Sequence, residues 1–435
     1  MAKLLEFQGK HWLSQAGLPV PKGRAAETAA EAENAAQWLN APVVVKGQVQ
    51  TGGRGKAGMA RIAGTPAEAA RAAAEILAGA IGGIPARRVL VEQKLDIVKE
   101  YYCAIVLNSA RAARSPMLVF SPDGGADIED VPENRVRCFN IDPLFGLRAY
   151  EALAVCIQSG VPAEETVRLA DIMVKLAAAY TRYDCRTIEI NPLVLTADGR
   201  FCCAGCKMDI DNAAVYRQPQ FEIKIARDLP GEPTDFDEIG WMIEEMDERG
   251  TGFLMSMDYD EKSPGYVGYH PIGGGSAMMG LDALNYAGLK PANYADTSGN
   301  PVAAKIYRVA KCVLTQPGIE GYLLGGFMMA NQEQWHHAHA VVKALREILP
   351  LKPGLPCVLL LCGNKEEESL QILREGLKDL MRPDQAGQRV EIYGRDHVSD
   401  TKFIGGRLAV LCQEYRKERS CVYNQGKNDH HFYRY

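Results

Sequence analysis

The sequence contains no long apolar segment and no excess of positive charge. No stretch approaches the roughly 20 apolar residues that a membrane-spanning helix needs. The N-terminal residues MAKLLEFQGKHWLSQ have neither the uninterrupted apolar segment nor the small-residue cleavage site of a secretory signal, so we expect a cytoplasmic protein. The net charge of −5 at pH 7 predicts no general attraction to nucleic acid or to an anionic membrane.

The sequence also lacks a second CxxC pair and a paired-histidine motif. One CxxC, Cys203 to Cys206, could by itself be a metal or redox pair. Structural zinc sites, however, need a further pair of ligands. Most other cysteines stand singly among apolar residues, as reduced thiols do in protein cores. We therefore interpret the cysteines, including this CxxC, as structural thiols.

The length of 435 residues is too great for one hydrophobic core and predicts two or three domains. Residues 1–235 mix helical and strand patterns, which indicates an α+β domain of largely antiparallel strands. We interpret an acidic stretch at 236–263 as a segment that connects two domains. A doubly wound α/β domain is expected at 264–415, and the polar, aromatic residues 416–435 are interpreted as a tail.

Helical spacing appears at 4–16 and 26–39, and the stretch 65–80 begins with a capping Thr65 followed by Pro66. Further helices are expected near 146–158 and 163–180. Strands are expected near 43–49, 59–63, 88–93, 101–107, 116–120 and 186–196.

In the C-terminal half, strand, glycine turn and helix alternate. The continuous apolar run Val358–Leu361 suits a parallel strand that is covered on both faces. Ligands of such sheets bind beyond the carboxyl ends of the strands, where Gly273–Gly275, Gly325–Gly326 and Gly363 fall. We expect helices to open at Gly273 and Gly325, where their N-termini favour phosphate or carboxylate.

Residues 43–58, VVVKGQVQTGGRGKAG, form the most informative segment. A β-branched run ends in Lys46, and a glycine-rich loop with Arg54 and Lys56 follows. Glycines let backbone N–H groups approach an anion closely. The spacing differs from the P-loop pattern GxxxxGK[ST], so another nucleotide fold is indicated. A plain hairpin turn is the alternative interpretation.

Two further segments carry oxygen ligands. Glu92, at the end of an expected strand, could accept hydrogen bonds from an adenine amine or ribose hydroxyls, although a solvated strand end would look the same. In Glu189-Ile190-Asn191-Pro192, strand alternation puts Glu189 and Asn191 on one face. Two hard oxygen donors side by side suit Mg²⁺, which takes few protein ligands and completes its shell with phosphates and water.

With VYRQP at 215–219 and GLKPANYAD at 288–296, these segments resemble the β-subunit family of succinyl-CoA synthetase. Citryl-CoA synthetase and the N-terminal part of ATP-citrate lyase share that architecture. The resemblance covers roughly residues 3–415. It implies an N-terminal ATP-grasp domain and a C-terminal flavodoxin-like CoA-ligase domain with a doubly wound parallel sheet. It also implies an acid–thiol ligase that converts a small carboxylic acid, CoA and ATP (or GTP) into acyl-CoA, nucleoside diphosphate and phosphate.

The resemblance carries site residues over by matching position. Lys46 would pair with the nucleotide phosphates. The implied nucleotide contacts are Lys46, Gly53, Arg54, Gly55, Glu92, Leu95 and Glu100. Asn191 would hold Mg²⁺, and Glu189 would orient a phosphohistidine. The implied substrate or phosphate contacts are Gly273, Gly274, Gly326, Phe327 and Met328. The resemblance implies that these residues assist phosphoryl transfer by positioning the reacting groups and neutralising the phosphate charge.

None of the eight histidines lies in the family's catalytic GH-small-G context. We interpret His336, His337 and His339 in an expected helix, and His430 and His431 in the tail, as structural or surface residues. An α-type partner subunit is therefore expected to supply the phosphohistidine.

Three positions depart from the family pattern. The family's second Mg²⁺ ligand, an aspartate, is replaced by Gly205, so we expect Asp209 or Asp211 to reach the ion, or the nucleotide to carry most of the coordination. Ile272 replaces an asparagine, and Leu360 replaces an arginine that binds the distal carboxylate. Loss of that charge-assisted pair is worth roughly 1.5–3 kcal/mol. We expect an acid other than succinate, such as a less charged one.

Two other functions stay open. The glycine turns GGGSAM and GGFMMANQ and the segment YGRDHVSDTKFIGG look closer to the citrate-type relatives, although those also carry an arginine at the position of Leu360. The three departures also fit a regulatory subunit that binds nucleotide without catalysis. An ATP-grasp ligase that acts alone on an amine is disfavoured by the C-terminal α/β domain.

Overall fold

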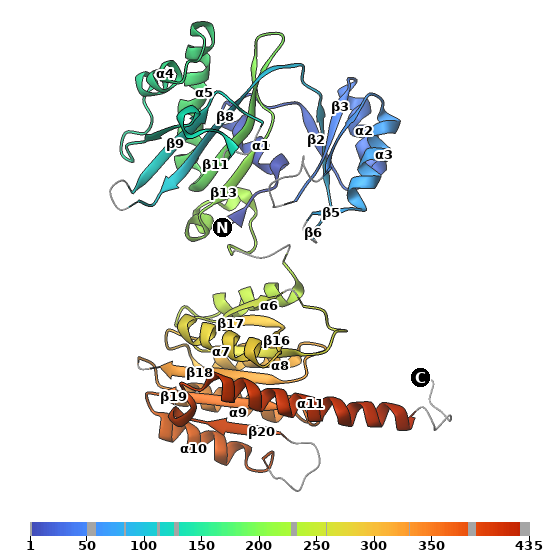
Figure 1. The fold of residues 1–435 in the computed structure, drawn as a ribbon, viewed down its shortest axis with the longest axis vertical. Coiled ribbons are helices and arrows are strands. Elements are labelled where there is room, and N and C mark those ends of the chain that lie inside the picture. The colour runs from blue at the N-terminus through green and yellow to red at the C-terminus, as the bar shows by residue number, and fades with distance from the viewer. Residues whose placement is uncertain are drawn as a thin grey trace. The chain divides into compact units, whose positions relative to one another are not determined.

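The computed structural model describes residues 2–49, 58–81, 84–110, 114–125, 130–227, 233–257, 259–329, 331–381 and 389–426. The chain divides into two compact units, Met1–Gly231 and Glu232–Tyr435 (Figure 1). The expected connecting segment 236–263 therefore lies in the second unit. Its helix α6 (Asp235–Glu245) begins at a capping box formed by Thr234 and Asp237, and it packs on strand β14 (Phe253–Ser256).

The first unit contains a small antiparallel sheet with the strand order β2-β7-β3-β4. Its elements are β2 (Gly23–Ala26), β7 (Val89–Gln93), β3 (Val43–Gly47), β4 (Ala60–Ala63), and the helices α2 (Ala29–Leu39) and α3 (Pro66–Leu77) that pack on one face. Alternation buries Val43 and Val45 in the core beneath these helices, so Lys46 faces the opposite side of the sheet. The expected cap is present, because the Thr65 hydroxyl accepts the Glu68 N–H at 3.2 Å.

A larger antiparallel sheet has the order β1-β13-β11-β8-β9-β10, with β12 paired to β11. Its strands are β1 (Ala2–Lys3), β13 (Lys207–Ile210), β11 (Cys185–Thr196), β8 (Ile97–Asn108), β9 (Ser115–Ser121), β10 (Arg137–Asn140) and β12 (Phe201–Cys203). Helices α4 (Ala149–Gln158) and α5 (Ala163–Arg182) share its core with Ile188, Ile190 and Met208. Glu189, between the two isoleucines, therefore faces the other side.

Shorter elements complete the first unit. They are α1 (Glu6–Gln15), the paired strands β5 (Ala80–Ile81) and β6 (Ile84–Pro85), and the 3₁₀ turns η2 (Glu133–Arg135), η3 (Asn212–Arg217) and η4 (Pro219–Phe221). Helix α1 is seated closely on the β13 end of the large sheet. A Cβ at Gly9 would stand 2.7 Å from the Cys206 sulfur and 3.5 Å from the Met208 Cβ, so this glycine permits the approach.

The second unit has a five-stranded parallel sheet in the order β16-β15-β18-β19-β20. In chain order this is 2-1-3-4-5, the flavodoxin-like arrangement, which confirms the expected fold. The strands are β15 (Tyr266–Pro271), β16 (Lys290–Pro291), β18 (Tyr322–Met329), β19 (Cys357–Gly363) and β20 (Val390–Tyr393). A separate two-stranded antiparallel ribbon joins β14 to β17 (Asn293–Asp296).

Helices cover both faces of the parallel sheet (Figure 1). One core lies with α7 (Gly274–Tyr286) and α11 (Thr401–Gly426), and the other with α8 (Ala303–Thr315), α9 (Trp335–Ile348) and α10 (Glu366–Leu377). Helix α11 continues to Gly426, into the stretch expected to be a tail, and its earlier part is anchored by the buried Leu408 and Cys412. The short 3₁₀ turn η5 spans Arg395–His397.

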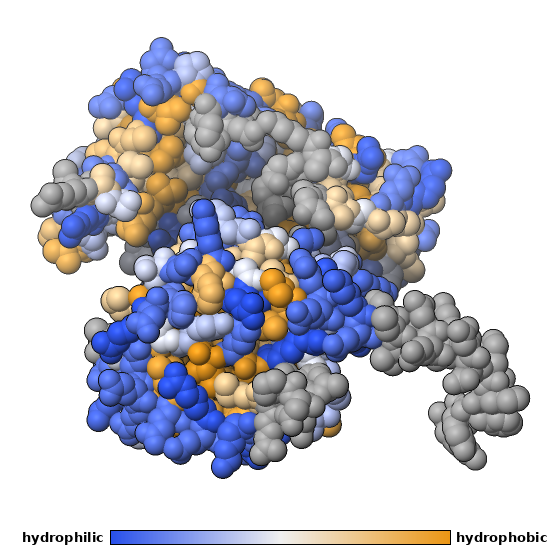
Figure 2. All heavy atoms as spheres, turned by 60° about the horizontal axis from the view of Figure 1, so that its bottom comes forward, coloured by the Kyte–Doolittle hydropathy of each residue, from blue (hydrophilic) through white to orange (hydrophobic). Residues whose placement is uncertain are grey.

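The outer surface matches the composition. Figure 2 shows mostly hydrophilic residues on the face of the second unit that it presents, with apolar residues gathered in a smaller area. Across the described ranges, no helix combines the length and the apolarity that a bilayer crossing would require.

One local expectation was wrong. The sequence predicted a helix opening at Gly325, but residues 322–329 form strand β18, and α9 begins only at Trp335. The reason is that this stretch is apolar throughout and pairs with β15 on one side and β19 on the other. Gly326, Phe327 and Met328 therefore lie on a strand and have no helix N-terminus behind them.

Candidate active site

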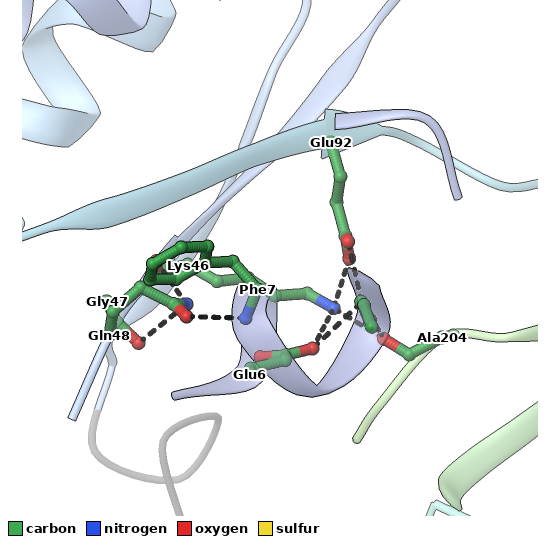
Figure 3. Close-up of polar contacts among 8 residues, drawn as sticks. Glu6, Phe7, Lys46, Gly47, Gln48, Glu92 and Ala204 are labelled. Carbon is green, nitrogen blue, oxygen red and sulfur yellow. Dashed lines mark hydrogen bonds and ion pairs between the residues drawn. The ribbon is translucent and has the colours of Figure 1, made fainter. Parts of the chain in front are cut away.

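Four charged side chains meet on the inner face of the small sheet, and Figure 3 labels three of them, Glu6, Lys46 and Glu92. The Lys46 ammonium forms ion pairs with Glu92 and with Glu6, the latter at 3.3 Å. The Lys10 ammonium lies 2.6 Å from Glu92 and 2.9 Å from Glu6. Both ammonium groups donate to the Ala204 carbonyl oxygen at 2.8 Å. We call Glu6, Lys10, Lys46 and Glu92 the charge cluster; its formal charges sum to zero.

Each member of the cluster is fixed by regular structure. Lys46 on β3 pairs in register with Leu90 on β7, and Glu92 stands two residues further on the same face. Glu6 and Lys10 are four residues apart on α1 and therefore share one face of the helix. Sequence reasoning missed this second pair, because such spacing is equally typical of a solvated helix surface.

Helix α1 is also tied to the strand that carries Lys46. The Phe7 N–H donates to the Gln48 side-chain oxygen at 3.1 Å, and the Gln48 amide donates to the Lys46 carbonyl at 3.2 Å (Figure 3). Gln48 is buried. The end of β3 and the start of α1 therefore hold each other in place.

An apolar cluster adjoins the charge cluster, and the half-buried Leu95 forms its surface. Leu95, one of the implied nucleotide contacts, packs against Val194, Cys202 and Ala204. Burial raises the pKa of Cys202 to about 11, partly offset by Lys10, so this thiol is neutral and the surface is apolar. A flat purine ring can pack against such a surface while polar groups at its edge fix the orientation.

Glu100 and Asn191 come together at Gly125. The Gly125 N–H donates to the Asn191 side-chain oxygen at 3.0 Å, and a Cβ at residue 125 would overlap the Glu100 carboxylate. Glu189, two residues before Asn191 on β11, lies on the same face and is half-buried. Three hard oxygen groups thus line this part of the sheet.

The position opposite Asn191 is Gly205. The ladder pairs Glu189 with Lys207, and the Ala204 and Gly205 N–H groups both donate to the Pro192 carbonyl, at 3.0 and 3.2 Å. A Cβ at residue 205 would overlap the Asn191 carbonyl oxygen. The backbone has closed over the place that the family's aspartate would occupy.

Asp209 does not lie near Asn191. It pairs in register with Thr187, four residues from Asn191, which corresponds to about 13 Å along the strand. It is buried, and that burial raises the pKa of its carboxyl group against the pull of Lys207 and Lys3. Asp209 and Asn191 therefore cannot share one ion, and among the described residues no three His, Cys, Asp or Glu side chains converge as a metal site.

The phosphate-covering glycines of the sequence prediction, Gly53–Gly55 with Arg54, lie outside the described residues.

A cavity of about 800 Å³ opens between α1 and the β2 edge, and its walls include Lys10 and Glu92 together with Trp12 and Trp38. Sequence reasoning gave no sign of this cavity.

In the second unit, two of the implied substrate-binding N–H groups have partners inside the protein. The Gly273 N–H donates to an Asp296 oxygen at 2.9 Å. The Phe327 N–H donates at 2.9 Å to the Ser276 hydroxyl, which itself donates to the Gly325 carbonyl at 2.5 Å. Gly274 is exposed at the start of α7, with open space where a side chain would be. Of the implied contacts on β18, Gly326 is buried and the Met328 side chain is exposed.

Ile272 and Leu360 are fully buried core residues. Leu360 packs with Tyr269 and Phe327 in the core beneath α7 and α11, and Ile272 lies in the core on the other side of the sheet. A Cβ at Gly326 would stand 2.9 Å from the Leu360 carbonyl and 3.1 Å from Ile272, so the space between them is filled. These two positions offer no cation or amide to a substrate.

A buried polar network includes His270, which lies three residues before the first glycine turn at Gly273. The His270 ring accepts or donates at 2.7 Å with the Tyr322 hydroxyl and at 3.0 Å with the Thr297 hydroxyl, which also meets the His337 ring at 3.0 Å. Burial lowers the pKa of both histidines to about 3, so both rings are neutral. The interpretation of His337 as a non-catalytic residue agrees with this interior position.

Comparison with known protein sequences gives three findings. Residues 3–195 match the model of the ATP-grasp domain family. The chain is 35% identical over 390 residues to the Thermus thermophilus succinate–CoA ligase [GDP-forming] subunit beta, covering 87% of this chain and 95% of that protein. It is 34% identical over 385 residues to the Bacillus subtilis succinate–CoA ligase [ADP-forming] subunit beta, covering 85% and 93%.

Among solved structures, the fold is similar to ATP citrate lyase from Methanothrix soehngenii. The TM-score is 0.73 at 21% identity, with 95% of this chain and 99% of that chain covered. At that identity the likeness concerns the fold.

Proposed function

The chain belongs to the ATP-grasp family of succinate–CoA ligase β subunits, and we propose that it is the nucleotide-binding subunit of an acid–CoA ligase. The reaction is carboxylic acid, CoA and nucleoside triphosphate to acyl-CoA, nucleoside diphosphate and phosphate. The observation that carries the proposal is the convergence of Lys46, Glu92 and the apolar surface at Leu95 on one face of the ATP-grasp unit.

The nucleotide would bind between these groups. Its purine ring would pack on Leu95, which rests on the buried Val194, Cys202 and Ala204, while Glu92 accepts from the base. Lys46, whose side chain is 20% exposed, would turn to the phosphates, and the backbone of Gly53–Gly55 would cover them. Positioned cations of this kind stabilise the charge that develops during phosphoryl transfer.

The donor set fits Mg²⁺ in part. The Asn191 side-chain oxygen and the Glu189 carboxylate share a half-buried face, and the Glu100 carboxylate lies nearby, whereas Gly205 offers no ligand. Mg²⁺ bound with a nucleotide neutralises phosphate charge and needs only one or two protein oxygens. Asn191 would provide one of them, and Glu189 would orient the phosphohistidine of an α-type partner subunit.

We further propose that the substrate is an acid less charged than succinate. The positions that would carry the family's amide and guanidinium groups are Ile272 and Leu360, and both side chains are buried in the core. A second carboxylate would find no charge-assisted partner at these positions. A citrate-type acid is the alternative substrate class.

The test is to co-express the chain with an α-type partner and to screen acids for CoA-dependent release of nucleoside diphosphate. We expect turnover with at least one acid that exceeds turnover with succinate. Equal or faster turnover of succinate than of every other acid would overturn the proposed specificity. A complex that binds nucleotide but turns over no acid would favour the second candidate, a nucleotide-binding regulatory subunit, which the closed backbone at Gly205 supports.

A further inference from the structure

We propose that Glu6 and Lys10 of α1 are positioning residues of the nucleotide site, which keep Glu92 compensated when Lys46 leaves it for a phosphate group. The inference rests on the proposed nucleotide binding and assigns a role to two residues that the site description above leaves without one. It begins from the contacts of the charge cluster (Figure 3).

Lys46 cannot leave its present position to bind a phosphate group unless another cation takes its place beside Glu6 and Glu92. Its ammonium is held by Glu6, Glu92 and the Ala204 carbonyl, and the two carboxylate side chains are only 2% and 4% exposed. Two neighbouring carboxylates that lose their cation in a buried site repel each other and pay a large desolvation cost. The departure of Lys46 therefore requires a second cation.

Lys10 meets that requirement. It contacts the same three groups as Lys46, at 2.6 Å to Glu92, 2.9 Å to Glu6 and 2.8 Å to Ala204. Its side chain is 6% exposed, against 20% for Lys46, so the more exposed lysine is the one with room to move. Burial alone would lower the pKa of Lys10, but Glu6 and Glu92 outweigh that effect and raise it, so the ammonium stays charged.

The seating of α1 keeps Lys10 in place during this exchange. Gly9, next to Lys10 in the chain, lies against Cys206 and Met208, and Phe7 is bonded to Gln48 at the end of β3. With Lys46 turned away, the three remaining charges sum to −1. Without Lys10 they would sum to −2, and Lys46 would be retained between the two carboxylates.

This charge balance can be tested by calorimetric titration of the full chain with Mg·ATP and Mg·GTP, using the nucleotide that the wild type binds more tightly. Lys10→Met should weaken binding at least about tenfold, the equivalent of one lost charge-assisted contact. Adding Glu6→Gln should restore binding to within about threefold, because the cluster is then neutral again. A residue with a purely structural role would show no such rescue.

Glu6→Gln alone should bind nucleotide at least as tightly as the wild type, because Lys46 is then held less firmly. This variant and the double variant decide the question if Lys10→Met fails to fold, as checked by circular dichroism. Lys305→Met is the matched control. Lys305 is a buried lysine of the second unit whose ammonium donates to the Glu244 and Gly250 carbonyls, and its loss should leave nucleotide affinity unchanged.

The inference is overturned if Lys10→Met binds nucleotide within threefold of the wild type, if the double variant binds no better than Lys10→Met, or if Glu6→Gln alone weakens binding tenfold. A wild-type chain that binds neither nucleotide would instead overturn the proposed nucleotide site, and the inference with it.

Discussion

Gly205 stands opposite Asn191, so close that a Cβ at position 205 would overlap the Asn191 carbonyl oxygen. The Gly205 N–H also donates to the carbonyl of Pro192, the residue after Asn191. The glycine therefore does more than omit a carboxylate, because the Asn191 backbone occupies the space that a side chain would need. Substituting the family's aspartate for Gly205 therefore has two distinguishable outcomes, a loss of stability or a gain in Mg²⁺ binding.

We expect Gly205→Asp to destabilise the protein and to leave its affinity for Mg²⁺ unchanged. Overpacking against backbone and burying a carboxylate should together lower the free energy of unfolding by at least about 2 kcal/mol. Urea unfolding with and without Mg²⁺ measures both effects. Gly406→Asp is a control on an open part of α11, where no atom lies near the added Cβ. A stable Gly205→Asp variant that gains Mg²⁺-dependent stability would contradict the expectation.

Leu360→Arg tests the acid site in the same way. Leu360 is fully buried in one core cluster with Tyr269 and Phe327, so a guanidinium group there would have neither space nor a described partner. We expect a loss of at least about 3 kcal/mol in the free energy of unfolding and no gain in turnover of succinate. Leu360→Met, which conserves volume, should cost less than about 1.5 kcal/mol. Improved succinate turnover by the arginine variant would show that position 360 faces the substrate.

The sequence predicted the helices and strands better than the contacts between them. Lys46 and Glu92 were each identified as nucleotide contacts, but their mutual ion pair depends on the β3–β7 register, which a sequence does not display. Asp209 was suggested as a metal ligand because it is near Gly205 in the chain. The β11–β13 ladder instead sets it beside Thr187, since each residue advances the strand by about 3.3 Å.

Two other misses have similar causes. The sequence predicts a helix opening at Gly325, yet this glycine lies within an apolar stretch that pairs with strands on both sides. Glu6 and Lys10 were overlooked because an (i, i+4) pair of opposite charge is common on exposed helices. Only the packing of α1 against Ala204 and Glu92 shows that this pair is buried.

Lys46→Met should weaken nucleotide binding at least about tenfold, because the phosphates lose a cation that no other described residue of β3 can replace. The fold should survive, since Lys10 still compensates Glu6 and Glu92. Calorimetric titration measures the affinity. The matched control is Lys175→Met, which removes an exposed lysine paired with Asp171 on α5. Unchanged affinity of the Lys46 variant would remove Lys46 from the nucleotide site.

The buried histidines His270 and His337 predict a loss of stability in mild acid. Burial lowers the pKa of each ring to about 3 in the folded protein, against about 6.5 in an unfolded chain. The unfolded state therefore binds more protons below pH 6.5, so the stabilisation is complete above that pH and falls as the pH drops toward 3. Between pH 7.5 and 5.5 the two residues together should cost about 2–3 kcal/mol of unfolding free energy in urea titrations. His337→Gln should remove about half of this pH dependence. An unchanged pH dependence in the His337 variant would show that the His337 ring is not held neutral in the folded state.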